Sequence, residues 1–444
     1  MNTTELLRFL DAGVSSLHVA REITARFEQA GFRRLSLGEQ WMLEPGQGVL
    51  VEQGGTVVAF RAGTSPPAES GILAMAAHTD SPGLQLKLRS ARFADGLLQV
   101  PVEVYGGPIL ATWLDRELSL AGVVVARNGN AGVDRVLVRS PRTVAVIPNL
   151  AIHLNREVNE NLHYNQQEHL QALFPGVTAA EDNDGPAAML SLLGQMADLD
   201  PGDIVDAQVF LLPSETAHSF GRKPTLVVSP RIDNLAGCFP VMEALRTAPV
   251  RPHGALAVFF NHEEIGSNTN VGAAGGFLDQ VLHRLVLAHQ SSSSTGALDT
   301  FERAMARTVL ISNDAAHARH PNYREKHDPG YAPWIGGGPV IKRSATWRYL
   351  GDAAVAGWFR AVCESLTVPV QELQSRSDMR AGSTIGPAVA TRFGVRGVDV
   401  GIPMLAMHSA RETAAVDDVA AMTTVLTEIF ERTQNEVLDP PETR

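Results

Sequence analysis

The chain has 444 residues, of which 44% are hydrophobic and 19% are charged, a composition typical of soluble globular proteins. This length is more than one hydrophobic core normally spans, so we expect two domains. The formal net charge of −11 argues against nucleic acid or an anionic membrane as a partner, because both bind concentrated basic surfaces.

The cysteine content and the lengths of the apolar runs limit the kind of protein and the cellular compartment that the sequence allows. Cys238 and Cys363 are the only cysteines, which excludes a disulfide framework and a Cys-rich zinc site. The first residues lack the basic start and the apolar core of a signal peptide. No stretch approaches the roughly 18 consecutive apolar residues of a membrane span. We therefore expect a cytoplasmic protein.

The first part of the chain predicts a helix followed by strands. Residues 16–30 carry an apolar stripe at helical spacing that is closed by Gly31. Residues 48–60 are typical of two short strands joined around Gly54-Gly55, which predicts a hairpin. Residues 72–77 are an unbroken apolar run and predict a short buried strand.

The middle of the chain has a different character. Its β-rich segments are separated by Gly, Asn and Pro and interrupted by one helix-like stretch at residues 187–196; they cover residues 98–104, 122–125, 136–138, 143–147 and 207–212. We expect an inserted, mainly antiparallel β domain over residues 89–221. Residues 1–88 and 222–444 would then form the second, catalytic domain.

After residue 225 the pattern changes to strands alternating with helices. Predicted strands at residues 225–228, 255–260, 308–311 and 368–373 are interspersed with helical segments, the first at residues 234–247. This alternation implies βαβ units around a largely parallel, buried sheet. The predicted fold class is α/β, a mostly parallel sheet flanked by helices, with the inserted β domain attached.

Two adjacent carboxylates, Glu263 and Glu264, follow the apolar run at residues 255–260. A fully buried strand cannot simply continue through two ionised side chains, because desolvating unpaired charge is costly. Something cationic should meet them where the strand ends. A metal centre in which one glutamate binds metal and the other is a general base would explain the pair.

Other potential ligands recur at equivalent places. Carboxyl ends of parallel strands meet at one edge of a sheet, so side chains that follow different strands can converge there. The candidates are His78 and Asp80 after the strand at residues 72–77, Asp233, Glu263 and Glu264, Asp314, and His408. Such a nitrogen and oxygen set suits zinc, manganese or cobalt.

The number of carboxylates is enough for two ions, about 3.5–4 Å apart, with one carboxylate bridging them. Such a pair would polarise a carbonyl and lower the pKa of a bridging water. A general base is still required to take the proton and pass it to a leaving amine. Asp80, two residues after His78, is positioned to contact a metal-binding side chain rather than the metal itself.

These motifs, taken with several others in the same order, resemble the M18 metallopeptidases, the aspartyl aminopeptidases and their bacterial relatives. The similarity runs from the N-terminal helix almost to the end of the chain. The motifs are His78-Thr79-Asp80-Ser81-Pro82-Gly83, Asp233-Asn234, His262-Glu263-Glu264-Ile265-Gly266-Ser267, Ser312-Asn313-Asp314-Ala315-Ala316-His317, Gly338-Pro339-Val340-Ile341-Lys342, Gly382-Ser383-Thr384-Ile385-Gly386 and Met407-His408-Ser409-Ala410-Arg411-Glu412.

The resemblance implies a role for each metal-site residue. His78 and Asp314 would hold one ion, Glu264 and His408 would hold the other, and Asp233 would bridge the two. Glu263 would be the general base. The resemblance implies two divalent ions per subunit, with zinc as the metal and manganese or cobalt as the alternatives.

The resemblance also implies the substrate and the assembly. His317 would contact a peptide substrate, Lys342 would pair with its acidic N-terminal side chain, and Tyr349 would complete that pocket. The inserted domain would mediate dimers that assemble into a dodecamer, and His153 would enter a neighbouring subunit's active site. The implied activity is the removal of N-terminal residues, preferably Asp or Glu.

Each candidate also has a simpler explanation. Asp233 could cap a helix, although Asn234 can serve as the cap instead. A lone histidine such as His408 is often a hydrogen-bonded structural residue. For the whole chain, the alternatives are a dinuclear aminopeptidase or amidohydrolase with broad or neutral specificity, and a non-catalytic oligomeric scaffold.

Overall fold

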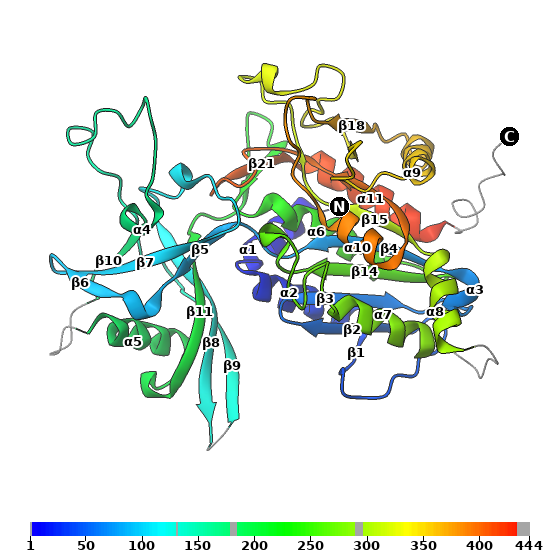
Figure 1. Cartoon of the computed structure of the whole chain (residues 1–444), viewed down its shortest axis with the longest axis horizontal. Helices are drawn as coiled ribbons and strands as arrows, with labels where there is room; N and C mark the ends of the chain where they lie inside the picture. Colours follow the sequence, from blue (N-terminus) through cyan, green and yellow to red (C-terminus); the bar gives the residue numbers. More distant parts are fainter. Residues whose placement is uncertain (1, 130–131, 178–183, 289–295, 433–444) are drawn as a thin grey trace.

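The computed structural model describes residues 2–129, 132–177, 184–288 and 296–432. Its larger part is built on a nine-stranded sheet with the strand order β1-β2-β3-β14-β4-β15-β19-β17-β18 (Figure 1). These strands are β1 (Arg33–Arg34), β2 (Gly48–Gln53), β3 (Thr56–Arg61), β14 (Gly254–Phe260), β4 (Ile72–His78), β15 (Val309–Asn313), β19 (Arg396–Gly401), β17 (Val340–Arg343) and β18 (Gln371–Gln374).

The four central strands of this sheet, β14, β4, β15 and β19, run parallel. Antiparallel pairs occur on both sides of them, between β2, β3 and β14 and between β17 and β19. Gly54 and Gly55 have φ of 57° and 85°, as a tight hairpin turn between β2 and β3 requires, so the predicted hairpin is confirmed. The predicted α/β class, with a mostly parallel sheet, is confirmed as well.

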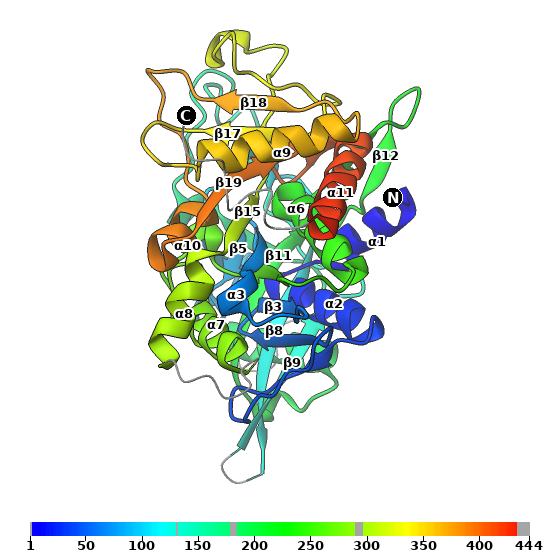
Figure 2. The same ribbon diagram turned by 90° about the vertical axis from the view of Figure 1, so that its right-hand side faces the viewer.

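Helices cover both faces of the main sheet, and Figure 2 shows the two groups on opposite sides. One group is α1 (Thr3–Ala12), α2 (Ser16–Gln29), α6 (Ile232–Thr247), α9 (Ala353–Ser365) and α11 (Val416–Glu431). The other is α7 (Phe277–Ala288), α8 (Ala297–Ala306) and α10 (Ile385–Phe393), with the short α3 (Pro67–Ser70) beside α8. The helices predicted at residues 16–30 and 234–247 correspond to α2 and α6.

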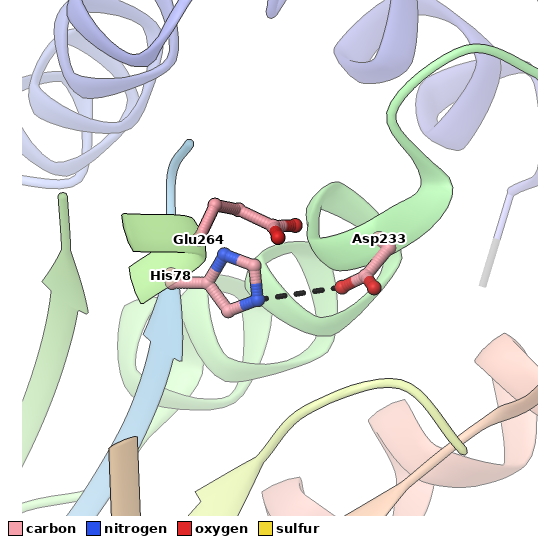
Figure 3. Close-up of side chains that lie close together, drawn as sticks. All are labelled: His78, Asp233 and Glu264. Atoms are coloured by element: carbon pink, nitrogen blue, oxygen red, sulfur yellow. Dashed lines mark ion pairs between the residues drawn. The ribbon is translucent and has the colours of Figure 1, made fainter. Parts of the chain in front are cut away.

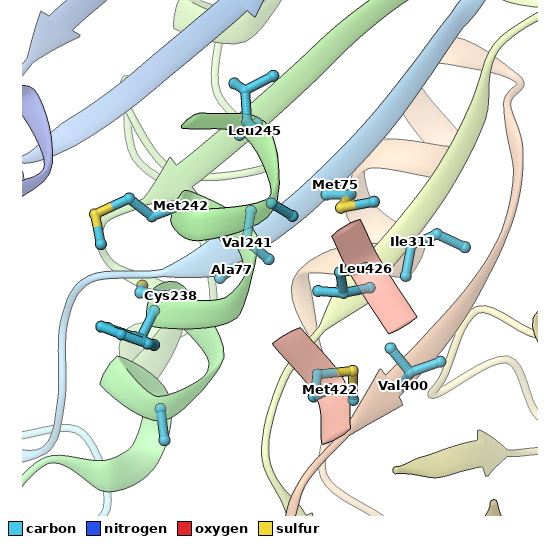
Figure 4. Close-up of a cluster of buried hydrophobic side chains, with 14 of the residues drawn as sticks. Met75, Ala77, Cys238, Val241, Met242, Leu245, Ile311, Val400, Met422 and Leu426 are labelled. Atoms are coloured by element: carbon cyan, nitrogen blue, oxygen red, sulfur yellow. The ribbon is translucent and has the colours of Figure 1, made fainter. Parts of the chain in front are cut away.

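The two cores follow from the alternation of side chains along the buried strands. In β4, Met75 and Ala77 enter the core under α6 and α11, whereas Ala74 and Ala76 enter the core under α7 and α8. Figure 4 shows the first of these cores, formed by Val241, Met242, Leu245, Met422 and Leu426 of the helices with Met75, Ala77, Ile311 and Val400 of the sheet.

A second sheet is built from the middle of the chain and is antiparallel throughout, in the order β10-β7-β5-β11-β8-β9 with β6 on β7. It has its own core, against which α5 (Gly185–Ala197) packs. The short helix α4 (Gln166–His169) lies beside β7. The strands are β5 (Gly83–Leu86), β6 (Arg92–Ala94), β7 (Leu97–Tyr105), β8 (Leu118–Asn128), β9 (Gly132–Arg139), β10 (Gln171–Phe174) and β11 (Ile204–Pro213).

Two details of this sheet differ from the sequence-based expectation. Strand β5 pairs with β7 and β11, although it lies before the expected boundary at residue 89. Residues 143–147 form no continuous strand; Ala145 and Val146 make only isolated bridges. Pro141 and Pro148 flank this segment, and proline has no N–H to give to a ladder.

A third, five-stranded sheet has the order β12-β13-β21-β20-β16. Its strands are β12 (His218–Phe220), β13 (Leu226–Ser229), β21 (Glu412–Ala415), β20 (Pro403–Leu405) and β16 (Ala316–His317). The expectation that residues 225–228 belong to the parallel sheet is wrong, because β13 pairs antiparallel with β12 and β21. Alternate residues of β13 are only half-buried, whereas β4 and β14 are buried throughout. Within the described ranges, no helix has the length and apolar character needed to cross a membrane.

Candidate metal centre

Three central strands of the main sheet end at the same edge, and a predicted site residue stands at or after each end. His78 is the last residue of β4, and Asp314 directly follows β15. Glu263 and Glu264 lie in a short 3-10 helix, η4 (Glu263–Ile265), just after β14. Because these strands run parallel, their carboxyl ends bring the four side chains to one place.

Two further predicted ligands reach this edge from the five-stranded sheet. Asp233 lies at the start of α6, shortly after β13, and its peptide bond to Asn234 is cis. His408 lies between β20 and β21. The side chain of Asp233 is 5% exposed and that of His408 is 31% exposed, so His408 forms the open side of the cluster.

Asp233 stands between the two histidines. Its Oδ1 lies 3.3 Å from His78 Nε2, and its Oδ2 lies 3.5 Å from His408 Nε2. On the outer sides, His78 Nε2 lies 3.3 Å from Asp314 Oδ1 and His408 Nε2 lies 3.4 Å from Glu264 Oε2. Figure 3 shows His78, Asp233 and Glu264 gathered around one point, and their ligand atoms lie within 4.8 Å of one another. The five side chains therefore form two groups that share Asp233.

The electrostatics of the cluster favour a bound cation. Burial, and the nearby Asp233, raise the pKa of Glu264 well above its usual value. Within the described part of the chain, Oε1 of Glu264 is buried without a hydrogen-bond partner, although buried carboxylate oxygens are normally paired. Imidazole and carboxylate donors suit zinc, manganese and cobalt. The residues present therefore fit a divalent metal site.

Asp80 supports this cluster from the side. Its two carboxylate oxygens accept hydrogen bonds from the backbone N–H groups of Glu263 and Glu264, each over 3.1 Å. Tyr105 donates its hydroxyl to Oδ2 over 2.8 Å. His78 Nδ1 lies 3.1 Å from the backbone oxygen of Asp80, so Nε2 of His78 is the nitrogen that faces the cluster.

Glu263 is half-buried beside the cluster, at the start of η4. Its burial raises its pKa to about 8. Among the residues that the structure describes, it forms no ion pair, unlike its neighbour Glu264. A carboxyl group with a pKa near neutrality is suited to proton exchange.

The sequence motifs contain one residue whose contribution was not anticipated, Glu412 in β21. Its Oε1 accepts a hydrogen bond from the backbone N–H of His408 over 2.6 Å, and its Oε2 accepts one from the N–H of Asp233 over 3.0 Å. One buried carboxylate thus fixes the backbone of both a histidine and the aspartate between the histidines. Its place in the His408-Ser409-Ala410-Arg411-Glu412 motif was the only available signal.

Lys342 and Tyr349 lie next to the cluster and are both buried. Lys342 Nζ donates a hydrogen bond to Asp314 Oδ2 over 3.1 Å. The same nitrogen lies 5.3 Å from the centre of the Tyr349 ring, within the range of a cation–π contact. The structure therefore brings both predicted pocket residues together, beside one of the predicted ligands.

His317 and His153 differ in their relation to the cluster. His317, in β16, keeps a solvent-exposed surface, yet the atoms packed around it and the charge of Lys342 lower its pKa, and the charges of Asp233, Asp314 and His408 also act on it, so it lies beside the cluster. His153 lies in an exposed turn between the strands of the second sheet. In residues 2–129, 132–177, 184–288 and 296–432, neither histidine forms an ion pair with a predicted ligand.

Comparison with known proteins identifies one family. The family model described as "Aminopeptidase I zinc metalloprotease (M18)" matches residues 9–430. A "Probable M18 family aminopeptidase 2" of Pseudomonas aeruginosa (strain UCBPP-PA14) is 39% identical over 422 residues, which cover 95% of this chain and 96% of that protein. One from Ectopseudomonas mendocina (strain ymp) is 39% identical over 426 residues, 96% and 97% of the two chains.

Solved structures of similar fold extend over nearly the whole chain. A chain in the cryo-electron microscopy structure of the Ape4 and Nbr1 complex is 34% identical, with a TM-score of 0.91 over 97% of this chain and 85% of that chain. A chain of the S. cerevisiae mApe1 dodecamer is 23% identical, with a TM-score of 0.85 over 99% and 98%. The second likeness concerns the fold alone.

Proposed function

Because the chain belongs to the M18 family of metalloaminopeptidases, we propose that it removes N-terminal Asp or Glu residues from peptides, using two divalent metal ions. The observation that carries this proposal is the position of Asp233. Each of its carboxylate oxygens faces a different histidine, His78 on one side and His408 on the other. A carboxylate in that position is the natural bridge between two ions.

The two groups around Asp233 give the ligand assignment. His78 and Asp314 would hold one ion, and Glu264 and His408 would hold the other. Zinc is the metal in the description of the family, and the same donors would also accept manganese or cobalt. When bound, such ions polarise the scissile carbonyl and make the attacking water more acidic.

Glu263 would be the general base. It would take a proton from the attacking water and deliver it to the nitrogen of the leaving amine. Its half-buried position next to Glu264 supports this role, because it reaches the cluster without being committed to an ion pair among the described residues. Asp80 would act by positioning, since its carboxylate fixes the backbone of both glutamates.

The preference for an acidic N-terminal residue rests on Lys342. A buried ammonium group beside the metal centre can attract a substrate carboxylate and form a charge-assisted hydrogen bond with it. Tyr349 would line the same pocket, and His317 would contact the peptide. A broader specificity is the second candidate, because Lys342 is already hydrogen-bonded to Asp314 and part of its charge is satisfied without substrate.

For the assembly, we propose dimers that build a dodecamer in the cytoplasm, with residues 89–221 as the dimerisation domain and residues 1–88 and 222–444 as the catalytic domain. The exposed apolar side chains around His153 support this. Leu150, Ile152 and Leu154 are 57%, 49% and 74% exposed, and clustered exposed apolar residues mark interaction surfaces. His153 would reach the active site of a neighbouring subunit.

The decisive experiment compares Asp-, Glu-, Leu- and Ala-anilides as substrates after the metal-free protein is reloaded with zinc, manganese or cobalt. We expect no activity without metal and the highest kcat/KM on Asp or Glu with at least one metal. Metal titration should reach two ions per chain. Faster cleavage of Leu than of Asp and Glu with every metal would contradict the acidic preference and favour the broad-specificity enzyme.

A further inference from the structure

The second sheet contacts the metal centre through residues 105–112, a segment that begins at the last residue of β7. We name it the clamp segment. It begins at Tyr105 and ends in a single 3-10 turn, η2 (Leu110–Thr112). Although it belongs to the second sheet, its backbone and side chains contact residues on two sides of the cluster.

The first contact is made by Tyr105. Its hydroxyl donates to Asp80 Oδ2 over 2.8 Å, on the carboxylate that also accepts the N–H groups of Glu263 and Glu264. The Tyr105 ring is itself held edge-to-face against Phe210 of β11, with ring centres 5.7 Å apart. Asp80 is therefore anchored on a side chain that the second sheet fixes in place.

The second contact is with His408 and the residues after it. His408 Nδ1 donates to the backbone oxygen of Gly107 over 3.0 Å, and Ile109 N–H donates to the backbone oxygen of His408 over 2.9 Å. Ala410 N–H donates to Thr112 Oγ1 over 2.9 Å. Two hydrogen bonds thus hold the ring and the backbone of His408, a third holds Ala410 two residues later, and Nε2 of His408 is left facing Asp233.

A third contact is the close approach of Gly106 to Glu264. Gly106 has φ of +69°, and a Cβ at this position would lie 3.2 Å from Cβ of Glu264. Both the backbone angle and the space therefore favour glycine here. The clamp segment packs directly against the glutamate that we assign to the metal.

We infer that the clamp segment is a working part of the metal centre, with Tyr105 and Thr112 as positioning residues that set the affinity for the divalent ions. This inference rests on the proposed function, because it takes Glu264 and His408 to be metal ligands and Asp80 to be their support. Its consequence is that the second sheet contributes to metal binding as well as to any assembly. A small displacement of this sheet would move Asp80 and His408 relative to the main sheet.

Two conservative variants test it, Tyr105→Phe and Thr112→Val. The first removes only the hydroxyl that donates to Asp80. The second keeps the side-chain shape and removes the hydroxyl that accepts from Ala410 N–H and donates to the backbone oxygen of Ile109. Matched controls are Tyr164→Phe and Thr143→Val, which remove exposed hydrogen bonds of the second sheet outside the clamp segment. Zinc affinity is measured by competition with a chromophoric chelator on the full-length protein, and the melting temperature is measured on the metal-free form.

We expect Tyr105→Phe and Thr112→Val each to weaken zinc binding at least about tenfold, the usual effect of removing an outer partner of a metal ligand. The controls should bind zinc as the wild type does. A merely structural role would lower the melting temperature of the metal-free protein without changing zinc affinity, and that result would overturn the inference while leaving the proposed function intact. If the wild type bound neither zinc, manganese nor cobalt, the proposed function itself would fail, and the inference with it.

Discussion

Lys342 and Asp314 form a buried ion pair, with Nζ 3.1 Å from Oδ2 and side chains that are 3% and 10% exposed. The other oxygen of Asp314 faces His78 Nε2 at 3.3 Å. Burial alone would raise the pKa of Asp314, but Lys342 beside it lowers that pKa. The lysine assigned to the substrate pocket therefore also sets the charge of a residue assigned to the metal. With the proposed roles of Lys342 and Asp314, specificity and metal binding would be coupled through this pair.

Replacing Lys342 with Met should separate these two roles. A charge-assisted hydrogen bond contributes about 1.5–3 kcal/mol, so we expect kcat/KM for Asp- and Glu-anilides to fall about 10- to 100-fold. The kcat/KM for the Leu-anilide should fall much less. The matched control is Lys223→Met, which makes the same substitution at an exposed lysine distant in sequence from Lys342. Equal losses on all substrates would mean that Lys342 acts only through Asp314.

Glu263→Gln tests the general base. The substitution keeps the size of the side chain but removes its ability to take a proton, so kcat should fall by about 10²- to 10⁴-fold. Metal content, measured on the purified protein, should not change, because the ligand assignment gives Glu263 no metal bond. Glu302→Gln, in the exposed part of α8, controls for the loss of one carboxylate. Peptidase activity at the wild-type level in Glu263→Gln would refute this role.

Those residues that follow long apolar strands were predictable from the sequence. His78 and Glu264 stand at the ends of β4 and β14, whose residues are all buried, so the apolar runs mark both the strands and the sheet edge where they end. Asp233 is different: it was expected to follow a strand of the parallel sheet, yet it is delivered by β13 of the five-stranded sheet. Its motif singled it out as a candidate ligand, although the expected strand pairing was wrong.

The contacts that join distant segments could not be predicted. Lys342 lies in β17, a four-residue strand with two basic residues, and so short and polar a stretch gives no strand signal. Its pairing with Asp314 depends on β17 lying against β19. Tyr105 belongs to an alternating β segment. Nothing in that pattern distinguishes a tyrosine that donates a hydrogen bond to Asp80 from one that only packs within its own sheet. Such cross-sheet pairs depend on tertiary packing rather than on local pattern.

The packing of α6 and α11 under the main sheet predicts where the fold is most sensitive. Leu426 of α11 is fully buried among residues of α6, β4 and β15 (Figure 4). Leu426→Ala should lower the free energy of unfolding by about 2–5 kcal/mol, since it removes buried apolar contacts and leaves a cavity. Leu298→Ala in α8, where the side chain is 68% exposed, should change it by less than about 0.5 kcal/mol. Urea denaturation measures both free energies of unfolding. Equal values for Leu426→Ala and Leu298→Ala would contradict the packing of Leu426 in this core.

The pH dependence of stability can be predicted from His18, a buried residue of α2 outside the metal centre. Burial, together with nearby arginines, lowers the pKa of His18 to about 4, and its Nδ1 lies 2.8 Å from Ser15 Oγ. The unfolded chain, with a histidine pKa of about 6.5, binds a proton first as the pH falls, so the stability from neutral His18 is complete above pH ~6.5 and is lost toward pH ~4. Between pH 7 and 5 the free energy of unfolding should therefore fall less in His18→Gln than in the wild type, by up to about 2 kcal/mol. His163→Gln, at an exposed histidine, should keep the wild-type slope in urea denaturation at several pH values. Identical slopes for His18→Gln and the wild type would show that His18 does not carry this acid sensitivity.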